Sequence, residues 1–164
     1  MTTEAVRVVI VEDNETFRST LELLFGLRDE VVVVGSAASG DDAPELCRRL
    51  DPDVVLMDYR MPGLNGADAT RAVLAAAPRS RVVCLTASVT KDEVDEVFAA
   101  GAVACVTKDE DFDRLIGVIR EAEPLSGAHV DTVQLRVAAR DGDGAGGDRF
   151  GGVAHRGRVL VDGQ

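Results

Sequence analysis

The chain has 164 residues and a formal net charge of −11, and 46% of its residues are hydrophobic. This length and apolar content suit one globular domain with a short appendage. The acidic balance argues against a general nucleic-acid or anionic-membrane surface, because such surfaces are basic. No apolar run approaches the ~18 residues of a membrane span, and the start of the chain lacks the basic region of a signal peptide. We therefore expect a cytoplasmic protein.

Strand-like and helix-like segments alternate up to about residue 122. The strand-like runs are nearly continuous Val, Ile and Leu, as in "VRVVIV", whereas segments such as "ETFRSTLELLFGL" have apolar residues at helical spacing. The predicted strands are 6–11, 31–36, 54–57, 81–85 and 102–107, and the predicted helices are 15–27, 41–50, 65–77, 91–100 and 111–122. Thr90 and Glu93 form a capping box that starts the fourth helix. Pro44 stands in the first turn of the second helix, where proline is tolerated.

Five apolar strands that alternate with five helices predict an α/β fold. Continuous apolar runs are typical of a parallel sheet that helices cover on both faces. We expect a doubly wound, flavodoxin-like sheet with right-handed crossovers, and the strand order considered is 2-1-3-4-5.

The predicted domain covers residues 5–122, and the character of the sequence changes after it. Residues 123–164 are rich in Gly, Asp and Arg and have no helical period. We expect a flexible tail, and two weak strand-like pieces leave a small hairpin open. The three cysteines, Cys47, Cys84 and Cys105, are widely spaced without a C-x-x-C motif, which indicates small buried thiols in a reduced protein.

The stretch "VVLMDYRMPG" places a carboxylate, Asp58, at the end of a buried strand. Such a charge costs free energy unless something nearby requires it. In open α/β sheets the functional site lies at the carboxyl ends of the strands. The first strand is followed by Glu12 and Asp13, so three carboxylates converge if the first and third strands are neighbours. A hard cation is the natural remedy for their repulsion, and Mg²⁺ suits a few carboxylate and carbonyl oxygens at an open rim.

Two further residues lie at the carboxyl ends of the fourth and fifth predicted strands. Thr86 ends the fourth strand and supplies a hydroxyl group, and Lys108 follows the fifth strand and supplies a cation. A cation beside a metal and carboxylates makes sense if an anion also binds there. The set therefore fits phosphoryl transfer onto a carboxylate.

These residues resemble the receiver domain of two-component response regulators. The stretches "VVIVEDN", "VVLMDYRMPGLNG", "CLTAS" and "VTKDE" carry the resemblance, which covers about residues 5–122 and is strongest to the NarL/FixJ branch. The resemblance implies that Asp58 accepts a phosphoryl group from a sensor histidine kinase. It implies that Asp13, Asp58 and the backbone carbonyl of Arg60 bind Mg²⁺, with Glu12 acting mainly through water. Lys108 would then pair with the phosphoryl group, and Thr86 would hydrogen-bond to it and move.

The sequence departs from the family pattern at Cys105, three positions before Lys108, where the family usually has an aromatic residue. The coupled rotation of that aromatic residue with Thr86 is therefore in question. The DNA-binding domain of LuxR type that the branch carries has no counterpart in residues 123–164, so direct DNA binding by this chain is not expected. We expect an unknown downstream protein as target, and a homodimer is left open.

Three functions remain in competition at this stage. The first is a phosphorylation-driven switch that is not an enzyme beyond its own phosphorylation and dephosphorylation. The second is a fragment of a transcriptional regulator that has lost its DNA-binding domain, and the third is a scaffold that works without phosphorylation. A haloacid-dehalogenase-like phosphatase is disfavoured because Glu12-Asp13-Asn14 does not match its Asp-x-Asp motif. At Tyr59 and Arg60 only the backbone carbonyl of Arg60 is assigned a role, and a solvent-facing position of both side chains is left open.

Overall fold

The fold is a parallel sheet of five strands covered by helices, in a computed structural model that describes residues 4–87 and 90–122. The strands are β1 (Val6–Val11), β2 (Val31–Ala37), β3 (Val54–Asp58), β4 (Arg81–Thr86) and β5 (Ala104–Thr107). The helices are α1 (Glu15–Phe25), α2 (Ala43–Leu50), α3 (Gly66–Ala76), α4 (Lys91–Ala100) and α5 (Phe112–Ala122). The strand order is β2-β1-β3-β4-β5, and every strand pair is parallel. The predicted flavodoxin-like fold is confirmed, whereas the predicted tail at 123–164 lies outside the described residues.

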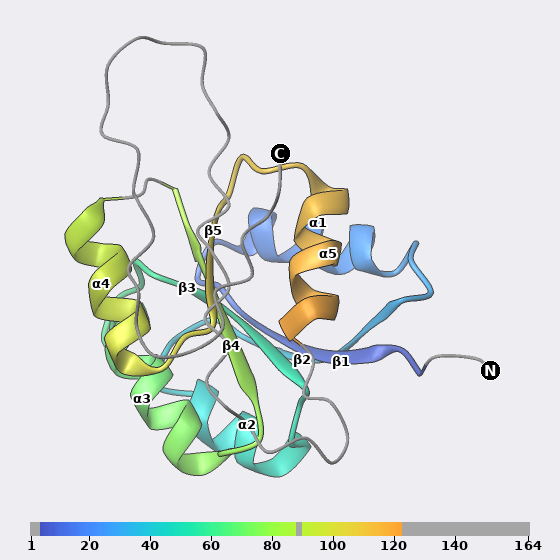
Figure 1. Ribbon diagram of the computed structural model, residues 1–164. Helices are drawn as coiled ribbons and strands as arrows, with labels where there is room; N and C mark the ends of the chain where they lie inside the picture. The colour runs from blue at the N-terminus through green and yellow to red at the C-terminus, as the bar shows by residue number, and fades with distance from the viewer. Residues whose placement is uncertain (1–3, 88–89, 123–164) are drawn as a thin grey trace, which may run out of the picture.

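The helices divide into two layers, with α1 and α5 on one face of the sheet and α2, α3 and α4 on the other (Figure 1). Each face has its own hydrophobic core, because successive side chains of a strand point to opposite faces. In β1, Val8 and Ile10 belong to the core under α1 and α5, and Val9 and Val11 belong to the core under α2, α3 and α4. Burial on both faces explains why the strands are nearly continuous apolar runs.

Several element ends differ from the prediction by one or two residues. Helix α1 ends at Phe25 rather than at residue 27, because Gly26 caps it and donates its N–H to the Glu22 carbonyl at 3.0 Å. Strand β5 begins at Ala104 rather than at residue 102, because the Ala102 N–H is used to close α4 on the Val97 carbonyl. The competing hydrogen bonds of helix caps therefore shorten both elements.

Helix α4 begins as predicted. The Thr90 hydroxyl accepts a hydrogen bond from the Glu93 N–H at 3.3 Å, and the helix ends at Gly101, whose φ is 113°. A positive φ of this kind favours glycine. The ends of α4 are therefore set by local sequence.

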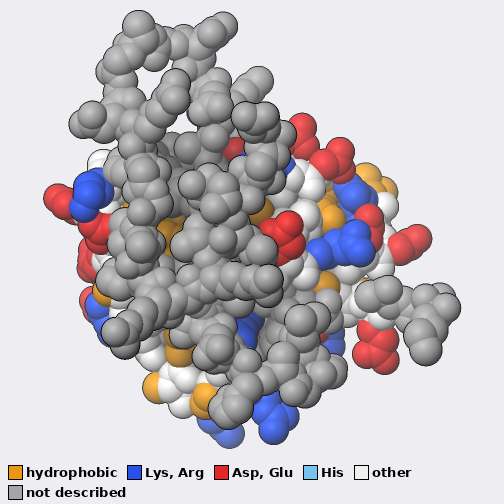
Figure 2. All heavy atoms as spheres, in the orientation of Figure 1, with side chains coloured by type: hydrophobic (Ala, Val, Ile, Leu, Met, Phe, Trp, Pro, Cys, Tyr) orange, Lys and Arg blue, Asp and Glu red, His pale blue; other side chains and the backbone are white. Residues whose placement is uncertain are grey.

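The part of the surface that Figure 2 leaves visible carries charged side chains of both signs. Acidic and basic side chains are interspersed around the visible margin of the molecule (Figure 2). Within residues 4–87 and 90–122, none of the helices has the length and apolar content that crossing a membrane requires. The three cysteines are free and buried, as predicted.

Candidate functional site

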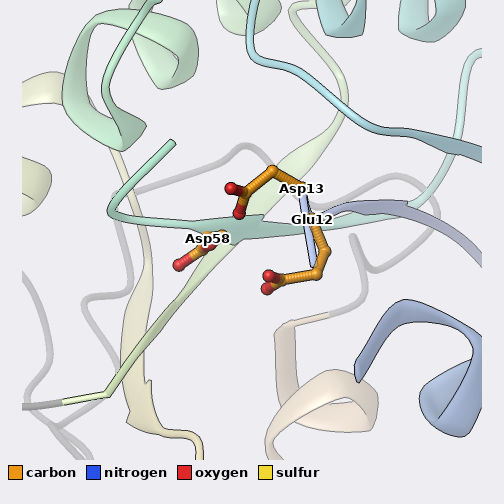
Figure 3. A group of neighbouring side chains, drawn as sticks. All are labelled: Glu12, Asp13 and Asp58. Carbon is orange, nitrogen blue, oxygen red and sulfur yellow. The ribbon is translucent and has the colours of Figure 1, made fainter. Parts of the chain in front are cut away.

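The carboxyl ends of β1 and β3 bring three acidic side chains together. The two strands are paired with Val11 opposite Met57, so the next residues along them, Glu12 and Asp58, are also neighbours. Glu12, Asp13 and Asp58 each offer a carboxylate oxygen, and these three oxygens lie within 4.8 Å of one another (Figure 3). The convergence predicted from the strand order is therefore present.

Lys108 supplies a positive charge to this carboxylate cluster. Its Nζ lies 2.9 Å from Glu12 Oε2 and 3.4 Å from Asp58 Oδ1. The same Nζ lies 4.8 Å from the ring centroid of Phe17 on α1, which favours the cation further. Lys108 thus reaches across β4 from the end of β5 to the end of β3.

Burial raises the free energy of the charged forms of Glu12 and Asp58. Glu12 is fully buried and Asp58 is 3% exposed, whereas Asp13 is exposed. Burial and the neighbouring Glu12 carboxylate raise the pKa of Asp58 from 3.8 to about 7, although Lys108 opposes the shift. Burial alone would lower the pKa of Lys108, but the Glu12 and Asp58 carboxylates outweigh it and raise that pKa. One ammonium group beside three carboxylates leaves room for a further cation.

Glu12 is held firmly in this position. The Asn14 N–H donates to Glu12 Oε1 at 3.1 Å, and the Arg18 guanidinium donates to the Glu12 carbonyl at 2.7 Å. Asn14 is itself the N-cap of α1, since its side chain accepts from the Phe17 N–H at 2.9 Å. The start of α1 therefore fixes the orientation of the acidic pair.

The donor set fits Mg²⁺. All three side chains offer oxygen, which is the ligand that Mg²⁺ prefers, and Asp13 is open to solvent so that water can complete the coordination. Zinc is a poorer fit because it favours His and Cys ligands. These are also the side chains for which the sequence predicts a metal.

Two glycines, Gly63 and Gly66, allow the backbone conformation of the loop after Asp58. Gly63 has a φ of +81°, a conformation that other residues rarely adopt. A Cβ at Gly66 would lie 2.7 Å from the Asp58 carbonyl oxygen, so only glycine allows α3 to start this close to the end of β3. The Arg60 N–H donates to Asp58 Oδ1 at 3.3 Å, which ties the loop to the carboxylate.

Thr86 lies at the same edge of the sheet as Asp58 and Lys108. It is the last residue of β4, is 3% exposed, and stands opposite Thr107 of β5. Its carbonyl accepts a hydrogen bond from the Lys108 N–H at 2.8 Å. All six residues that the sequence singles out therefore lie at one edge, which β1, β3, β4 and β5 share.

Two contacts at this edge were not predicted. A solvent-facing Tyr59 was left open, but Tyr59 is half-buried and its hydroxyl donates to Glu96 Oε2 at 2.6 Å. Arg60 is exposed, yet its guanidinium pairs with Glu93 Oε1 at 2.6 Å. No local pattern links residues 59 and 60 to a helix more than 30 positions away, so the sequence gives no signal for these contacts.

Cys105, three positions before Lys108, is the residue at which the sequence departs from the family pattern. Its side chain is 2% exposed and belongs to the core under α2, α3 and α4. It stands opposite Cys84 in the pairing of β4 with β5. The prediction that Cys105 is a core residue is confirmed.

Comparisons with known proteins agree with this geometry. The profile of the response regulator receiver domain family matches residues 8–120. The response regulator GacA of Pseudomonas aeruginosa is 34% identical over 116 residues, which cover 71% of this chain and 54% of that protein. The transcriptional regulatory protein DegU of Brevibacillus brevis is 32% identical over 115 residues, covering 70% and 49% of the two chains. The chain therefore spans about half the length of these curated relatives.

Solved structures give the same result. The signal receiver domain of the putative response regulator NarL from Mycobacterium tuberculosis superposes with a TM-score of 0.69 and 34% identity, covering 73% of this chain and 96% of that one. A LuxR-family two-component response regulator from an Aurantimonas species gives a TM-score of 0.67 and 28% identity, with coverage of 76% and 91%. This chain belongs to the response regulator receiver domain family.

Proposed function

We propose that this chain is a phosphorylation-driven switch of a two-component system. In this proposal Asp58 accepts a phosphoryl group from a sensor histidine kinase in the cytoplasm, with Mg²⁺ as cofactor. The observation that carries the proposal is the pairing of β1 with β3, which sets Glu12 and Asp13 beside Asp58, with Lys108 Nζ 3.4 Å from Asp58 Oδ1.

The proposed reaction is a single phosphoryl transfer. A carboxylate oxygen of Asp58 attacks phosphorus, an O–P bond forms, and the P–N bond to the kinase histidine breaks. The electron pair of that bond stays on the imidazole nitrogen. Asp58 must be ionised to attack, and its pKa of about 7 leaves it partly protonated at neutral pH. A bound Mg²⁺ would favour the carboxylate and offset the charge of the phosphoryl oxygens.

Each residue has a distinct role in this proposal. Asp13, Asp58 and the Arg60 backbone carbonyl hold Mg²⁺, and Glu12 acts mainly through water. Lys108 pairs with the phosphoryl oxygens, and Thr86 donates a hydrogen bond to them and moves. The buried position of Glu12 supports a role in fixing the electrostatics of the site rather than in direct exchange with solvent.

The output is a contact with a downstream partner protein. Because a relative of about twice the matched length is named a transcriptional regulatory protein, we propose transcriptional control as the class of output. The acidic net charge of −11, with acidic and basic side chains interspersed on the margin visible in Figure 2, favours a protein partner over direct DNA binding. A homodimer of this chain is a further partnership compatible with the proposal.

The test is the intact mass of the protein after incubation with acetyl phosphate. We expect the wild type to gain one phosphoryl group in the presence of Mg²⁺ and none in the presence of EDTA. Asp58→Asn should gain none, because an amide is a poor nucleophile. Asp68→Asn is the matched control, since Asp68 is an exposed aspartate on α3.

A folded wild type that gains no phosphoryl group with Mg²⁺ would contradict the proposal. It would favour a scaffold that works without phosphorylation. A gain that persists in Asp58→Asn would place the acceptor elsewhere.

A further inference from the structure

Two residues directly after Asp58 are tied to α4. The Tyr59 hydroxyl donates to Glu96 Oε2 at 2.6 Å, and Arg60 Nη2 lies 2.6 Å from Glu93 Oε1. We call these two contacts, Tyr59–Glu96 and Arg60–Glu93, the α4 clasp. They link the loop that carries the proposed metal ligand of Arg60 to a helix that contributes none of the six site residues.

The loop end of the clasp is attached to Asp58. The Arg60 N–H donates to Asp58 Oδ1 at 3.3 Å. Tyr59 is held by its backbone on two sides, since its N–H donates to the Leu85 carbonyl at 2.9 Å and its carbonyl accepts from Gly66 at 2.8 Å. The Arg60 backbone is therefore tied to the Asp58 carboxylate, and the Tyr59 backbone is anchored by two hydrogen bonds.

The Tyr59 side chain lies on the face of the sheet that α2, α3 and α4 cover. Met57 belongs to the core under α2, α3 and α4, and Tyr59, two residues later, packs against the same core. Cys105 is a small side chain in that core and is 2% exposed. Tyr59, the one tyrosine of the sequence, is thus the aromatic side chain that joins the end of β3 to α4.

The helix end of the clasp lies at the start of α4. Glu93 and Glu96 are three residues apart and so lie on the same face of the helix. Glu93 also belongs to the N-terminal cap, because its N–H donates to the Thr90 hydroxyl at 3.3 Å. Its side chain is 18% exposed, against 66% for that of Arg60, so the contact is partly shielded from solvent. The Glu93 side chain therefore connects the Arg60 guanidinium to the first turn of α4.

We propose that the α4 clasp transmits the state of Asp58 to α4, with Tyr59 and Arg60 as positioning residues; this inference rests on the proposed function. A phosphoryl group on Asp58 adds a charge of about −1.5 to −2 near the Arg60 backbone and competes with Glu93 for the Arg60 guanidinium. The two states of α4 then differ in their contacts with the loop. Such a difference in interaction is what a population shift requires.

The experiment is hydrogen exchange of the α4 backbone amides with and without acetyl phosphate, in the presence of Mg²⁺. Phosphorylation of each protein is first verified by intact mass. In the wild type we expect phosphorylation to change α4 exchange rates by about fivefold or more, the lower end of typical coupling between sites. In Tyr59→Phe, Glu96→Ala and Glu93→Ala, each of which removes one contact of the clasp, this change should fall to less than about half of the wild-type value.

Two controls separate coupling from simple support of the helix. Glu45→Gln removes an exposed ion pair of the same 2.6 Å length on α2 and should leave the α4 response intact. The double variant Tyr59→Phe/Glu96→Ala should respond like either single variant, because each change removes the same contact.

The outcomes are distinguishable. An α4 response of wild-type size in the clasp variants, or exchange that rises equally in both states, would overturn the clasp as a coupling device. A phosphorylated wild type without any α4 response would overturn it as well. A wild type that gains no phosphoryl group would overturn the proposed function, and this inference with it.

Discussion

The two sides of the sheet present different chemistry at the same edge. On the side of α1 and α5, Lys108 lies over Phe17 and pairs with the buried carboxylates of Glu12 and Asp58. On the side of α2, α3 and α4, Cys84 and Cys105 are part of a tightly buried core, and half-buried Tyr59 packs against it. The side of α1 and α5 therefore holds the charged groups. The side of α2, α3 and α4 is apolar, and the α4 clasp connects it to α4. The proposed chemistry and the proposed transmission thus occupy opposite sides of one strand end.

The largest expected effect comes from removing the cation on the charged side. Lys108→Met should slow phosphorylation by acetyl phosphate by about 10²–10³-fold, the usual effect of losing one group that stabilises transition-state charge. The time course of intact mass would measure it. Lys91→Met is the matched control, because Lys91 pairs with Asp95 on the exposed surface of α4. A folded Lys108→Met protein that reacts at the wild-type rate would remove Lys108 from the proposed mechanism.

The next effect tests the packing of the opposite side. Cys105→Phe should reduce the free energy of unfolding by about 1–3 kcal/mol, because an aromatic ring overfills a site that is 2% exposed. Cys105→Ala, which adds no volume, should cost about 1 kcal/mol. Urea unfolding would measure both. If the phenylalanine variant is as stable as the alanine variant, this side has space for the aromatic residue that the family usually carries.

The smallest effect concerns the pH dependence of the charged side without metal. The pKa of Asp58 is raised from 3.8 to about 7 in the folded protein, so the folded state binds more protons than the unfolded state between these values. The free energy of unfolding should therefore fall as the pH rises from about 4 to about 7. We expect Asp58 to contribute about 1–2 kcal/mol to this fall, after allowance for solvent and for Lys108.

Urea unfolding in EDTA between pH 4.5 and pH 8 would measure this dependence as the difference between wild type and Asp58→Asn. Mg²⁺ should reduce the difference, since it favours the ionised carboxylate. Equal pH dependence in the two proteins would show that Asp58 does not titrate in this range.

The sequence by itself determined the strands, the helices and most of the candidate site. Apolar runs in the strands and helical spacing between them predict a parallel sheet, because both patterns reflect burial that each element requires locally. The six site residues follow or end successive strands, and the carboxyl ends of parallel strands share one edge of the sheet. Their meeting at this edge therefore follows from strand order alone, and the structure brings them together there.

The tertiary structure decided what neither spacing nor burial pattern encodes. Element ends shifted where a cap hydrogen bond competed with the strand or helix, as at Gly26 and Ala102. Tyr59 and Arg60, whose side chains had no predicted partner, meet Glu96 and Glu93 only because the end of β3 and the start of α4 lie close together in the folded chain. Contacts between side chains more than 30 residues apart depend on how the layers pack. Local sequence therefore determines which residues lie at the strand ends, and the packing of helices on the sheet determines which side chains they contact.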